Sequence, residues 1–263
     1  MTPSKPFWAI GGMLLPVKGN NMASDKRVCY SVVVPCHNES ENLDKLVARI
    51  SDVLRKEKDS FEIIIVNDNS TDSTTTVLER LRKNVPELRY IIRTANPGVG
   101  NALREGFAKA GGRYIITMDG DMSHDPYELP NFLRQKDRHD IVCGSRYVSH
   151  GKANMDWSRK LISGAFNLLF RTLVGINIKD FTSGYRIIRR EVLEKIQLES
   201  KGFGIYIEIP LKAHISGFRL AEIPITYHKR EHGLSNLSYF RQGPEYLRVG
   251  LRVFWLRLRR LLS

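Results

Sequence analysis

The sequence Asp119-Gly120-Asp121 places two carboxylates one residue apart, directly after an apolar run at residues 113–118. Carboxylates this close repel each other, and a hard divalent cation such as Mg²⁺ or Mn²⁺ relieves the repulsion because it prefers oxygen ligands. Its other coordination positions can then hold water and substrate phosphates. Aspartates are also common as turn and helix-cap residues. The position of this pair after a predicted strand favours the cation site.

Two more polar segments, residues 35–39 and 67–72, also follow apolar runs. Asp68 comes at the end of its run, where its carboxylate is placed to accept hydrogen bonds from a nucleobase or a ribose. Asp72 is better explained as the cap of the helix that follows. His37 by itself is a weak metal or acid–base candidate, because single histidines are mostly structural or merely exposed.

Other common site motifs are missing from the sequence. Residues 96–101, Asn-Pro-Gly-Val-Gly-Asn, lack the third glycine of a dinucleotide-binding loop and follow the third predicted strand instead of the first. The sequence contains no P-loop. Cys29, Cys36 and Cys143 show neither a paired nor a zinc-type spacing, so we expect reduced thiols in a cytoplasmic protein.

From residue 28 onward, short β-branched runs alternate with longer amphipathic segments. This alternation predicts an α/β fold with a mainly parallel sheet flanked by helices. The predicted strands are residues 28–34, 61–66, 88–93, 113–118 and 141–146. The predicted helices are residues 41–57, 73–84, 99–110 and 127–136. Ligands bind at the carboxyl ends of the strands in such sheets, so the three polar segments become site candidates by position.

Two of these helices carry start signals. Ser40 is the expected N-cap of the first helix. Asp125, Pro126 and Glu128 match a cap, a first-turn proline and a capping-box glutamate for the helix at 127–136. Beyond residue 147 we expect a long basic helical stretch, a short strand at 183–188, a helix near 206–216 and an extended run at 219–227.

The last segment, residues 237–263, repeats leucines and arginines on a helical period. The apolar stripe of the predicted amphipathic helix consists of Leu247, Leu251, Phe254, Leu258 and Leu261. Such a helix either lies on an anionic membrane surface or packs on the domain with its basic face in solvent. Both interpretations stay open on the sequence alone.

The composition, with 42% hydrophobic and 26% charged residues in 263, excludes a disordered chain, a collagen and a coiled coil. We expect an irregular leader at residues 1–26, one domain at 27–236 and the C-terminal helix at 237–263. Residues 7–15 are apolar, but their flanks do not match a signal peptide. No uncharged apolar run reaches the length of a membrane-spanning helix, so any membrane contact is expected to be peripheral.

The formal net charge of +13 favours an anionic partner, which is nucleic acid, an acidic membrane or a phosphorylated small molecule. Eight cations against two aspartates fall in residues 152–190, and six arginines against one glutamate fall in residues 240–263. Nucleic acid is disfavoured because the strand-end loops are acidic and no basic patch is interleaved with aromatic residues. We therefore expect a cytoplasmic protein associated peripherally with the cytoplasmic face of a membrane.

Six ordered segments resemble the family 2 inverting glycosyltransferases with the GT-A fold, and in particular the dolichol-phosphate mannose synthase and polyprenyl-phosphate glycosyltransferase branch. The resemblance covers about residues 28–240. It implies a Rossmann-like fold and metal-dependent transfer of a sugar, mannose from GDP-mannose in the first instance, to a polyprenyl or dolichyl phosphate. The segments are VVVPCHNESENL, IIIVNDNSTDST, NPGVGNALREGF, YIITMDGDMSHDP, DIVCGSRY and DFTSGYRIIRREVL.

The resemblance also implies roles for individual residues. The nucleotide-sugar site would comprise Pro35, His37, Glu39, Val66, Asp68, Asp119 and Gly120. The Mg²⁺ or Mn²⁺ ligands would be Asp119, Asp121 and Ser123. The phosphate and acceptor contacts would be Arg146, Arg230 and Ser235. The catalytic group would be Asp121, Arg146 and Asp180.

The expected role of Asp180 depends on the acceptor. For a sugar hydroxyl, Asp180 is the candidate general base. A lipid phosphate is already largely anionic at pH 7, so Asp180 would orient the site instead.

The sequence departs from the family pattern at one phosphate-binding position. The family often has lysine where this chain has Asn236, and the change removes a positive charge. His37 in place of tyrosine and Gly120 in place of alanine fit a broader group of bacterial-type enzymes. A UDP-sugar donor, with a polyprenyl phosphate or a glycan hydroxyl as acceptor, therefore stays open as an alternative. A non-enzymatic nucleic-acid-binding module is a remote second alternative.

Overall fold

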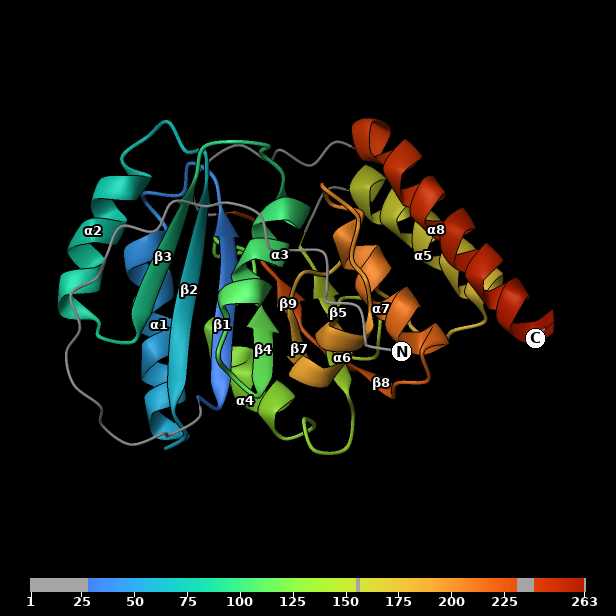
Figure 1. Cartoon of the computed structure of the whole chain (residues 1–263), viewed down its shortest axis with the longest axis horizontal. Helices are drawn as coiled ribbons and strands as arrows, with labels where there is room; N and C mark the ends of the chain where they lie inside the picture. The colour runs from blue at the N-terminus through green and yellow to red at the C-terminus, as the bar shows by residue number, and fades with distance from the viewer. Residues whose placement is uncertain (1–27, 155–156, 231–238, 263) are drawn as a thin grey trace, which may run out of the picture.

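The computed structural model describes residues 28–154, 157–230 and 239–262. Within them a seven-stranded sheet runs in the order β3-β2-β1-β4-β7-β5-β8 (Figure 1). A short pair, β6 (Lys152–Ala153) with β9 (Thr226–Tyr227), lies apart from it. The seven strands are β1 (Tyr30–Cys36), β2 (Phe61–Asp68), β3 (Leu88–Arg93), β4 (Tyr114–Thr117), β5 (Ile141–Ser145), β7 (Arg186–Arg189) and β8 (Leu220–Pro224).

The predicted mainly parallel sheet is confirmed. Parallel pairs join β1 to β2, β2 to β3, β1 to β4 and β5 to β8. The exception is β7, which runs antiparallel between β4 and β5. The carboxyl ends of β1, β2 and β4 therefore meet at one edge of the sheet, as their polar loops required.

Helices cover both faces of the sheet. On one face lie α1 (Leu43–Lys56), α2 (Thr74–Asn84) and α4 (Leu129–Leu133), and on the other lie α3 (Val99–Lys109), α6 (Arg190–Lys195) and α7 (Ile205–Ile215). In β1 the side chains of Val32 and Val34 join the first core and Val33 joins the second. This alternation follows from the two-residue period of a strand and explains why the strand is apolar throughout.

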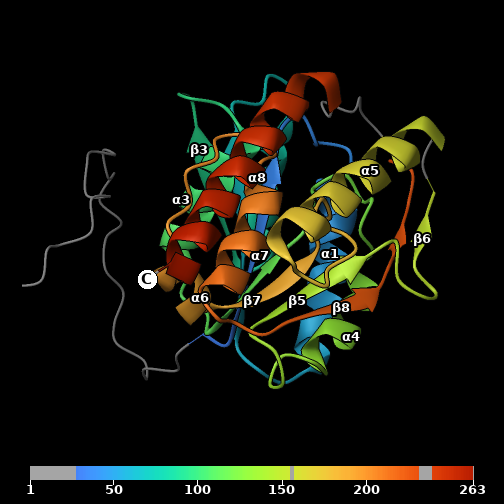
Figure 2. The ribbon, with the colours of Figure 1, turned by 90° about the vertical axis from the view of Figure 1, so that its right-hand side faces the viewer.

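Two long helices stand side by side at the far end of the molecule, α5 (Trp157–Val174) and α8 (Tyr239–Leu262) (Figures 1 and 2). They share a third core with α7, into which Phe170, Tyr246 and Val253 are buried. The leucines predicted as the apolar stripe are on a different face, since Leu247 is 45% exposed and Leu251 is 46% exposed. The alternative in which the C-terminal helix packs on the domain is therefore confirmed, but the packing side chains are Tyr246 and Val253 instead of Leu247 and Leu251.

Two of the predicted helix starts need correction. The first helix begins at Leu43 after Asn42, and the Ser40 amide donates to Asp72 instead of Ser40 acting as the cap. Asp125 does cap its helix by accepting from the Tyr127 amide. Glu128 accepts from the Thr226 amide across the molecule, so it does not complete a capping box. The predicted helix at 127–136 is a short 3₁₀ turn, η1 (Pro126–Glu128), followed by α4.

In the basic segment 152–190, fewer cations are exposed than the charge of the segment predicted. Arg186 is fully buried and donates to the Phe181 carbonyl. Arg190 donates to the carbonyls of Gly112 and Ala110. Both arginines are thus engaged with backbone carbonyls, and the charge of the fully buried Arg186 is not available to a membrane. Among the described residues, no helix is both long and apolar enough to span a bilayer.

Candidate active site

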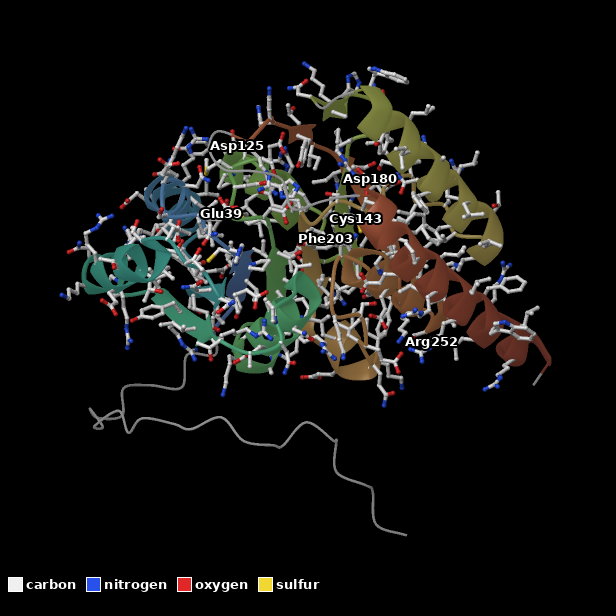
Figure 3. All side chains as sticks on the ribbon, turned by 90° about the horizontal axis from the view of Figure 1, so that it is seen from above. Glu39, Asp125, Cys143, Asp180, Phe203 and Arg252 are labelled. Carbon is white, nitrogen blue, oxygen red and sulfur yellow. The ribbon has the colours of Figure 1, made fainter. Side chains whose placement is uncertain are left out.

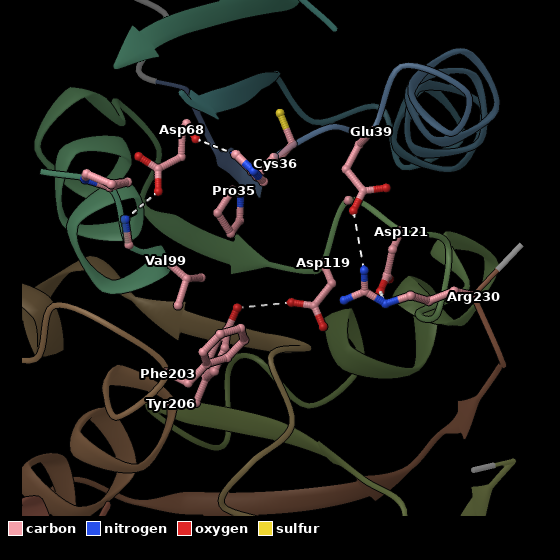
Figure 4. Close-up of a pocket in the computed structure, with 14 residues that line it drawn as sticks. Pro35, Cys36, Glu39, Asp68, Val99, Asp119, Asp121, Phe203, Tyr206 and Arg230 are labelled. Carbon is pink, nitrogen blue, oxygen red and sulfur yellow. Dashed lines mark hydrogen bonds and ion pairs between the residues drawn. The ribbon is translucent and has the colours of Figure 1, made fainter. Parts of the chain in front are cut away.

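A pocket of about 550 Å³ opens at the carboxyl ends of β1, β2 and β4 (Figure 4). It combines the three polar loops with residues from the α3 entry, the α7 entry and the chain just after β9. Eight of its lining residues were site candidates from the sequence: Pro35, His37, Glu39, Asp68, Asp119, Gly120, Asp121 and Arg230. The other six were not singled out individually, although Cys36 lies in the candidate segment 35–39: Cys36, Pro97, Gly98, Val99, Phe203 and Tyr206.

Asp119 and Asp121 both reach this pocket with one oxygen already held. The Tyr206 hydroxyl donates to Asp119 Oδ1 across 3.0 Å. The Ser123 amide donates to Asp121 Oδ1, also across 3.0 Å. The second oxygen, Asp121 Oδ2, is buried and accepts no hydrogen bond within the described chain. Arg230 Nε lies 2.7 Å from it and forms an ion pair.

This donor set fits a divalent cation that also binds a substrate. Among the described residues, no three His, Cys, Asp or Glu side chains come together to enclose a metal. Asp119 and Asp121 supply hard oxygen ligands, and the buried Asp121 Oδ2 lacks the hydrogen bond that such an atom normally has. The remaining ligands would come from water and phosphate. Ser123 is fully buried and does not line the pocket; its amide orients Asp121, and its carbonyl accepts from the His228 amide.

Glu39 is the third carboxylate of the pocket. It is buried, accepts from the Asn42 side chain and lies 3.7 Å from an Arg230 nitrogen. Burial raises the pKa of Glu39 to about 7, and the negative charge of Asp121 adds to the effect. One arginine thus faces two buried carboxyl groups in the pocket.

Asp68 lies across the pocket and is held by two donors. The Arg93 guanidinium forms an ion pair with one oxygen, and the Gly98 amide donates to the other across 2.6 Å. His37 Nδ1 lies 2.8 Å from the Asp68 carbonyl oxygen, so this nitrogen carries the proton and ties the first loop to the second. Val66 is fully buried beneath the loop and packs against Gly106, outside the pocket lining.

The glycine-rich entry of α3 has a packing role that the sequence did not reveal. A Cβ on Gly98 would lie 2.5 Å from the Lys201 carbonyl oxygen, and Gly98 has a φ of +147°. The Asn101 amide donates to the same carbonyl. The Glu245 side chain of α8 accepts from the Gly202 amide on the other side of this loop. The loop that carries Phe203 into the pocket is therefore held between α3 and α8.

Arg146 and Asp180 form a buried pair outside the pocket lining. Two Arg146 nitrogens donate to the two Asp180 oxygens, each across 2.7 Å, and Thr182 also donates to the carboxylate. Burial by itself raises the pKa of Asp180, but Arg146 and these hydrogen bonds outweigh it and hold the pKa below its ordinary value. A carboxylate engaged in this way is a poor proton acceptor. Of its two predicted roles, the geometry supports orientation.

His124 is a buried neighbour of the acidic pair that the sequence did not mark. The Asp119 amide donates to its Nδ1 across 3.2 Å, and its ring packs against Tyr185. Burial lowers the pKa of His124, so the neutral ring acts as an acceptor that holds the turn after β4. Ser235 and Asn236 lie outside the described residues.

Comparison with known proteins places this pocket within one family. Residues 31–197 match the family model described as glycosyl transferase family 2. The polyprenol monophosphomannose synthase of Mycolicibacterium smegmatis is 38% identical, over 79% of this chain and 80% of its own. The undecaprenyl-phosphate mannosyltransferase of Micrococcus luteus is 34% identical, over 86% and 96%. The dolichol-phosphate mannosyltransferase of Pyrococcus furiosus is 38% identical over 79% of this chain, which spans 59% of that relative.

Solved structures share the fold at lower sequence identity. Glucosyl-3-phosphoglycerate synthase from Mycobacterium tuberculosis, in complex with Mn²⁺, UDP and glucosyl-3-phosphoglycerate, aligns with a TM-score of 0.66 and 18% identity over 86% of this chain and 80% of that one. A complex of the same enzyme with Mg²⁺ and UDP gives a TM-score of 0.65 at 18% identity, over 86% and 79%. These matches support the α/β architecture.

Proposed function

The chain belongs to glycosyl transferase family 2, and from this premise we propose that it transfers mannose from GDP-mannose to the phosphate of a polyprenyl or dolichyl phosphate. The observation that carries the proposal is the combination of the Asp119–Asp121 pocket with three relatives that are all named for mannosyl transfer to such lipids. Neither the pocket nor the names would suffice alone. A pocket of this kind can bind several nucleotide sugars. The name of a relative describes that relative and not this chain.

The pocket supplies the groups that a nucleotide-sugar donor needs. Asp68 is fixed by Arg93 and the Gly98 amide and still faces the pocket, where its carboxylate can accept from a base N–H or a ribose hydroxyl. Arg230 brings a guanidinium next to Asp121, where it can pair with a diphosphate. The chain thus binds the donor at both ends of the pocket.

We propose Mg²⁺ or Mn²⁺ as the cofactor, held by Asp119 and Asp121. When bound, the cation stabilises the negative charge that grows on the departing nucleoside diphosphate. Two of the solved neighbours are complexes with UDP and Mn²⁺ or Mg²⁺, which supports a divalent cation in enzymes of this fold. Arg230 adds a fixed positive charge for the same leaving group.

The burial and ion pairing of Asp180 indicate which class of acceptor the enzyme uses. In an inverting transfer the acceptor oxygen attacks the anomeric carbon while the bond to the diphosphate breaks on the opposite face. A sugar hydroxyl must lose its proton to a base, and the candidate base Asp180 is buried and paired with Arg146. A lipid phosphate is largely deprotonated at pH 7 and needs no such base. The geometry therefore favours the phosphate acceptor over a glycan hydroxyl.

The acceptor also explains an exposed apolar face on α5 and α8. Trp157 is 78% exposed, Leu161 65% and Trp255 62%. Arg248 and Arg252 are exposed on α8, where Arg252 forms an ion pair with Glu199, and Figure 3 shows Arg252 away from Glu39 of the pocket. Exposed tryptophan, leucine and arginine on helices suit the boundary of an anionic bilayer. We propose that this face binds peripherally to the cytoplasmic leaflet, which is rich in anionic lipids.

A donor and acceptor screen tests the proposal. Purified protein is incubated with labelled GDP-mannose, UDP-glucose or UDP-N-acetylglucosamine, together with polyprenyl phosphate, with Mg²⁺, Mn²⁺ or EDTA. Labelled mannose in the lipid extract, lost in EDTA, supports the proposal. If only a UDP-sugar labels the lipid, the assignment of GDP-mannose as the donor is wrong. If an added glycan is labelled and the lipid is not, the assignment of the lipid phosphate as the acceptor is wrong.

A further inference from the structure

We propose that Arg230 holds the cation position on Asp121 until a nucleoside diphosphate binds, and that it thereby couples metal binding to nucleotide binding. The inference rests on the proposed function, because it takes the donor to be a nucleoside diphosphate sugar bound with a divalent cation. It adds a positioning role for one side chain in the state before the donor arrives.

The Asp121 carboxylate is buried and needs a compensating positive charge. Its side chain is 2% exposed. The Ser123 amide occupies Oδ1, and Oδ2 accepts no hydrogen bond within the described chain. A buried carboxylate without a compensating charge is strongly unfavourable. Arg230 provides that charge with Nε 2.7 Å from Oδ2. The ion pair thus stabilises the pocket in the absence of a metal.

Arg230 and a metal compete for the same oxygen. A divalent cation held by Oδ2 would have to take the place of the guanidinium that now lies against this oxygen. The two positive groups would also repel each other. Glu39 lies 3.7 Å from the same guanidinium. A metal that binds alone must therefore displace Arg230 from Asp121.

A diphosphate gives Arg230 a new partner. Guanidinium groups pair strongly with phosphate oxygens, often through two hydrogen bonds. The Arg230 side chain is 24% exposed at the rim of the pocket, whereas Asp121 is buried deeper. A nucleotide can thus draw Arg230 outward while it brings phosphate ligands for the metal. Each ligand then makes binding of the other more favourable, as linkage requires.

The test measures Mn²⁺ binding without any transfer reaction. Unbound Mn²⁺ is counted by its electron paramagnetic resonance signal during titration of the full-length protein, with and without saturating GDP or UDP. In the absence of nucleotide, Arg230→Gln should bind Mn²⁺ about fivefold or more tightly than the wild type. The gain in Mn²⁺ affinity upon addition of nucleotide should be smaller in the variant than in the wild type.

Two further variants make the result specific. Arg230→Lys keeps a positive charge at this position and should bind Mn²⁺ alone as weakly as the wild type. Arg55→Gln breaks the exposed pair with Glu87, far from the pocket, and should change neither titration. Thermal melting confirms that each variant is folded.

The possible failures are distinguishable. Equal Mn²⁺ affinity of wild type and Arg230→Gln without nucleotide, with intact binding in its presence, would overturn the coupling and leave the proposed function standing. Absence of Mn²⁺ binding in every variant, even with GDP or UDP, would overturn the metal assignment and the coupling together.

Discussion

Arg146 and Asp180 face each other as a two-point ion pair, with Arg146 Nε and Nη2 each 2.7 Å from a different carboxylate oxygen, and both side chains are buried. Loss of one partner leaves an uncompensated charge in the interior. We predict that Asp180→Asn lowers the free energy of unfolding by about 3–5 kcal/mol. Urea denaturation measures it. Asp52→Asn, which breaks the exposed pair with Lys56, is the matched control and should have little effect. Unchanged stability of Asp180→Asn would show that the pair is not structural.

The pKa of Glu39 predicts a pH dependence of stability. In the folded protein Glu39 keeps its proton up to about pH 7, whereas its ordinary value is 4.5. Between these values the folded state binds more protons than the unfolded state, so the free energy of unfolding falls as the pH rises. The stabilising contribution is fully present below about pH 4.5 and is lost above about pH 7. The total decrease is on the order of 3 kcal/mol.

Glu39→Gln isolates this contribution from other titrating groups. Because glutamine stays neutral, the variant should gain stability relative to the wild type as the pH rises through this window. Urea denaturation in EDTA at several pH values gives the difference. Parallel curves for the two proteins would show that Glu39 is ionised throughout.

The contact between α8 and the donor pocket predicts an effect at a distance. The Glu245 carboxylate accepts from the Gly202 amide across 3.1 Å, next to Phe203 of the pocket. Glu245→Ala should loosen this loop and raise the KM for the donor by up to about tenfold, the equivalent of one hydrogen bond to a charged group. The kcat should change less. Glu194→Gln, exposed on α6, is the control. An unchanged KM would mean that α3 holds the loop without help from α8.

The exposed face of α5 and α8 predicts membrane binding through specific side chains. Trp255→Ser and Leu251→Ser each remove a large exposed apolar group, with a loss of about 1.5–3 kcal/mol if that group is buried in lipid. We therefore expect at least about tenfold weaker binding to anionic vesicles, measured by sedimentation. Ile92→Ser changes a residue that is 48% exposed on β3 and serves as the control. Equal loss in all three variants would argue against this face.

Hydrophobic periodicity predicted the parallel part of the sheet and its loops, because strands covered on both faces are continuous apolar runs. The pocket carboxylates Asp68, Asp119 and Asp121 could be found for the same reason, since each lies next to such a run. The antiparallel insertion of β7 leaves no comparable signal. A strand's direction depends on which neighbours it pairs with, and its local pattern does not record them.

Long-range pairing explains the other differences. Tyr206 reaches Asp119 from 87 residues away, and Asp180 reaches Arg146 from 34 residues away. No local pattern encodes either contact, so the sequence did not predict Phe203 and Tyr206 in the pocket and placed Arg146 at the phosphates. On α8 the leucine stripe had the right period for a helix, but the period cannot show which face packs. Tyr246 and Val253 occupy the core, and Leu247 and Leu251 do not.

Metal-dependent transfer of mannose to a polyprenyl phosphate through the Asp119–Asp121 pocket is tested most directly by the mass of the lipid product. The product is formed from GDP-mannose and polyprenyl phosphate by the wild type and by Asp121→Ala, with Asp44→Asn as an exposed control. We predict a lipid heavier by one hexose from the wild type and the control, and at least about a hundredfold less from folded Asp121→Ala. The same yield from folded Asp121→Ala, or no hexosyl lipid from the wild type, would contradict it.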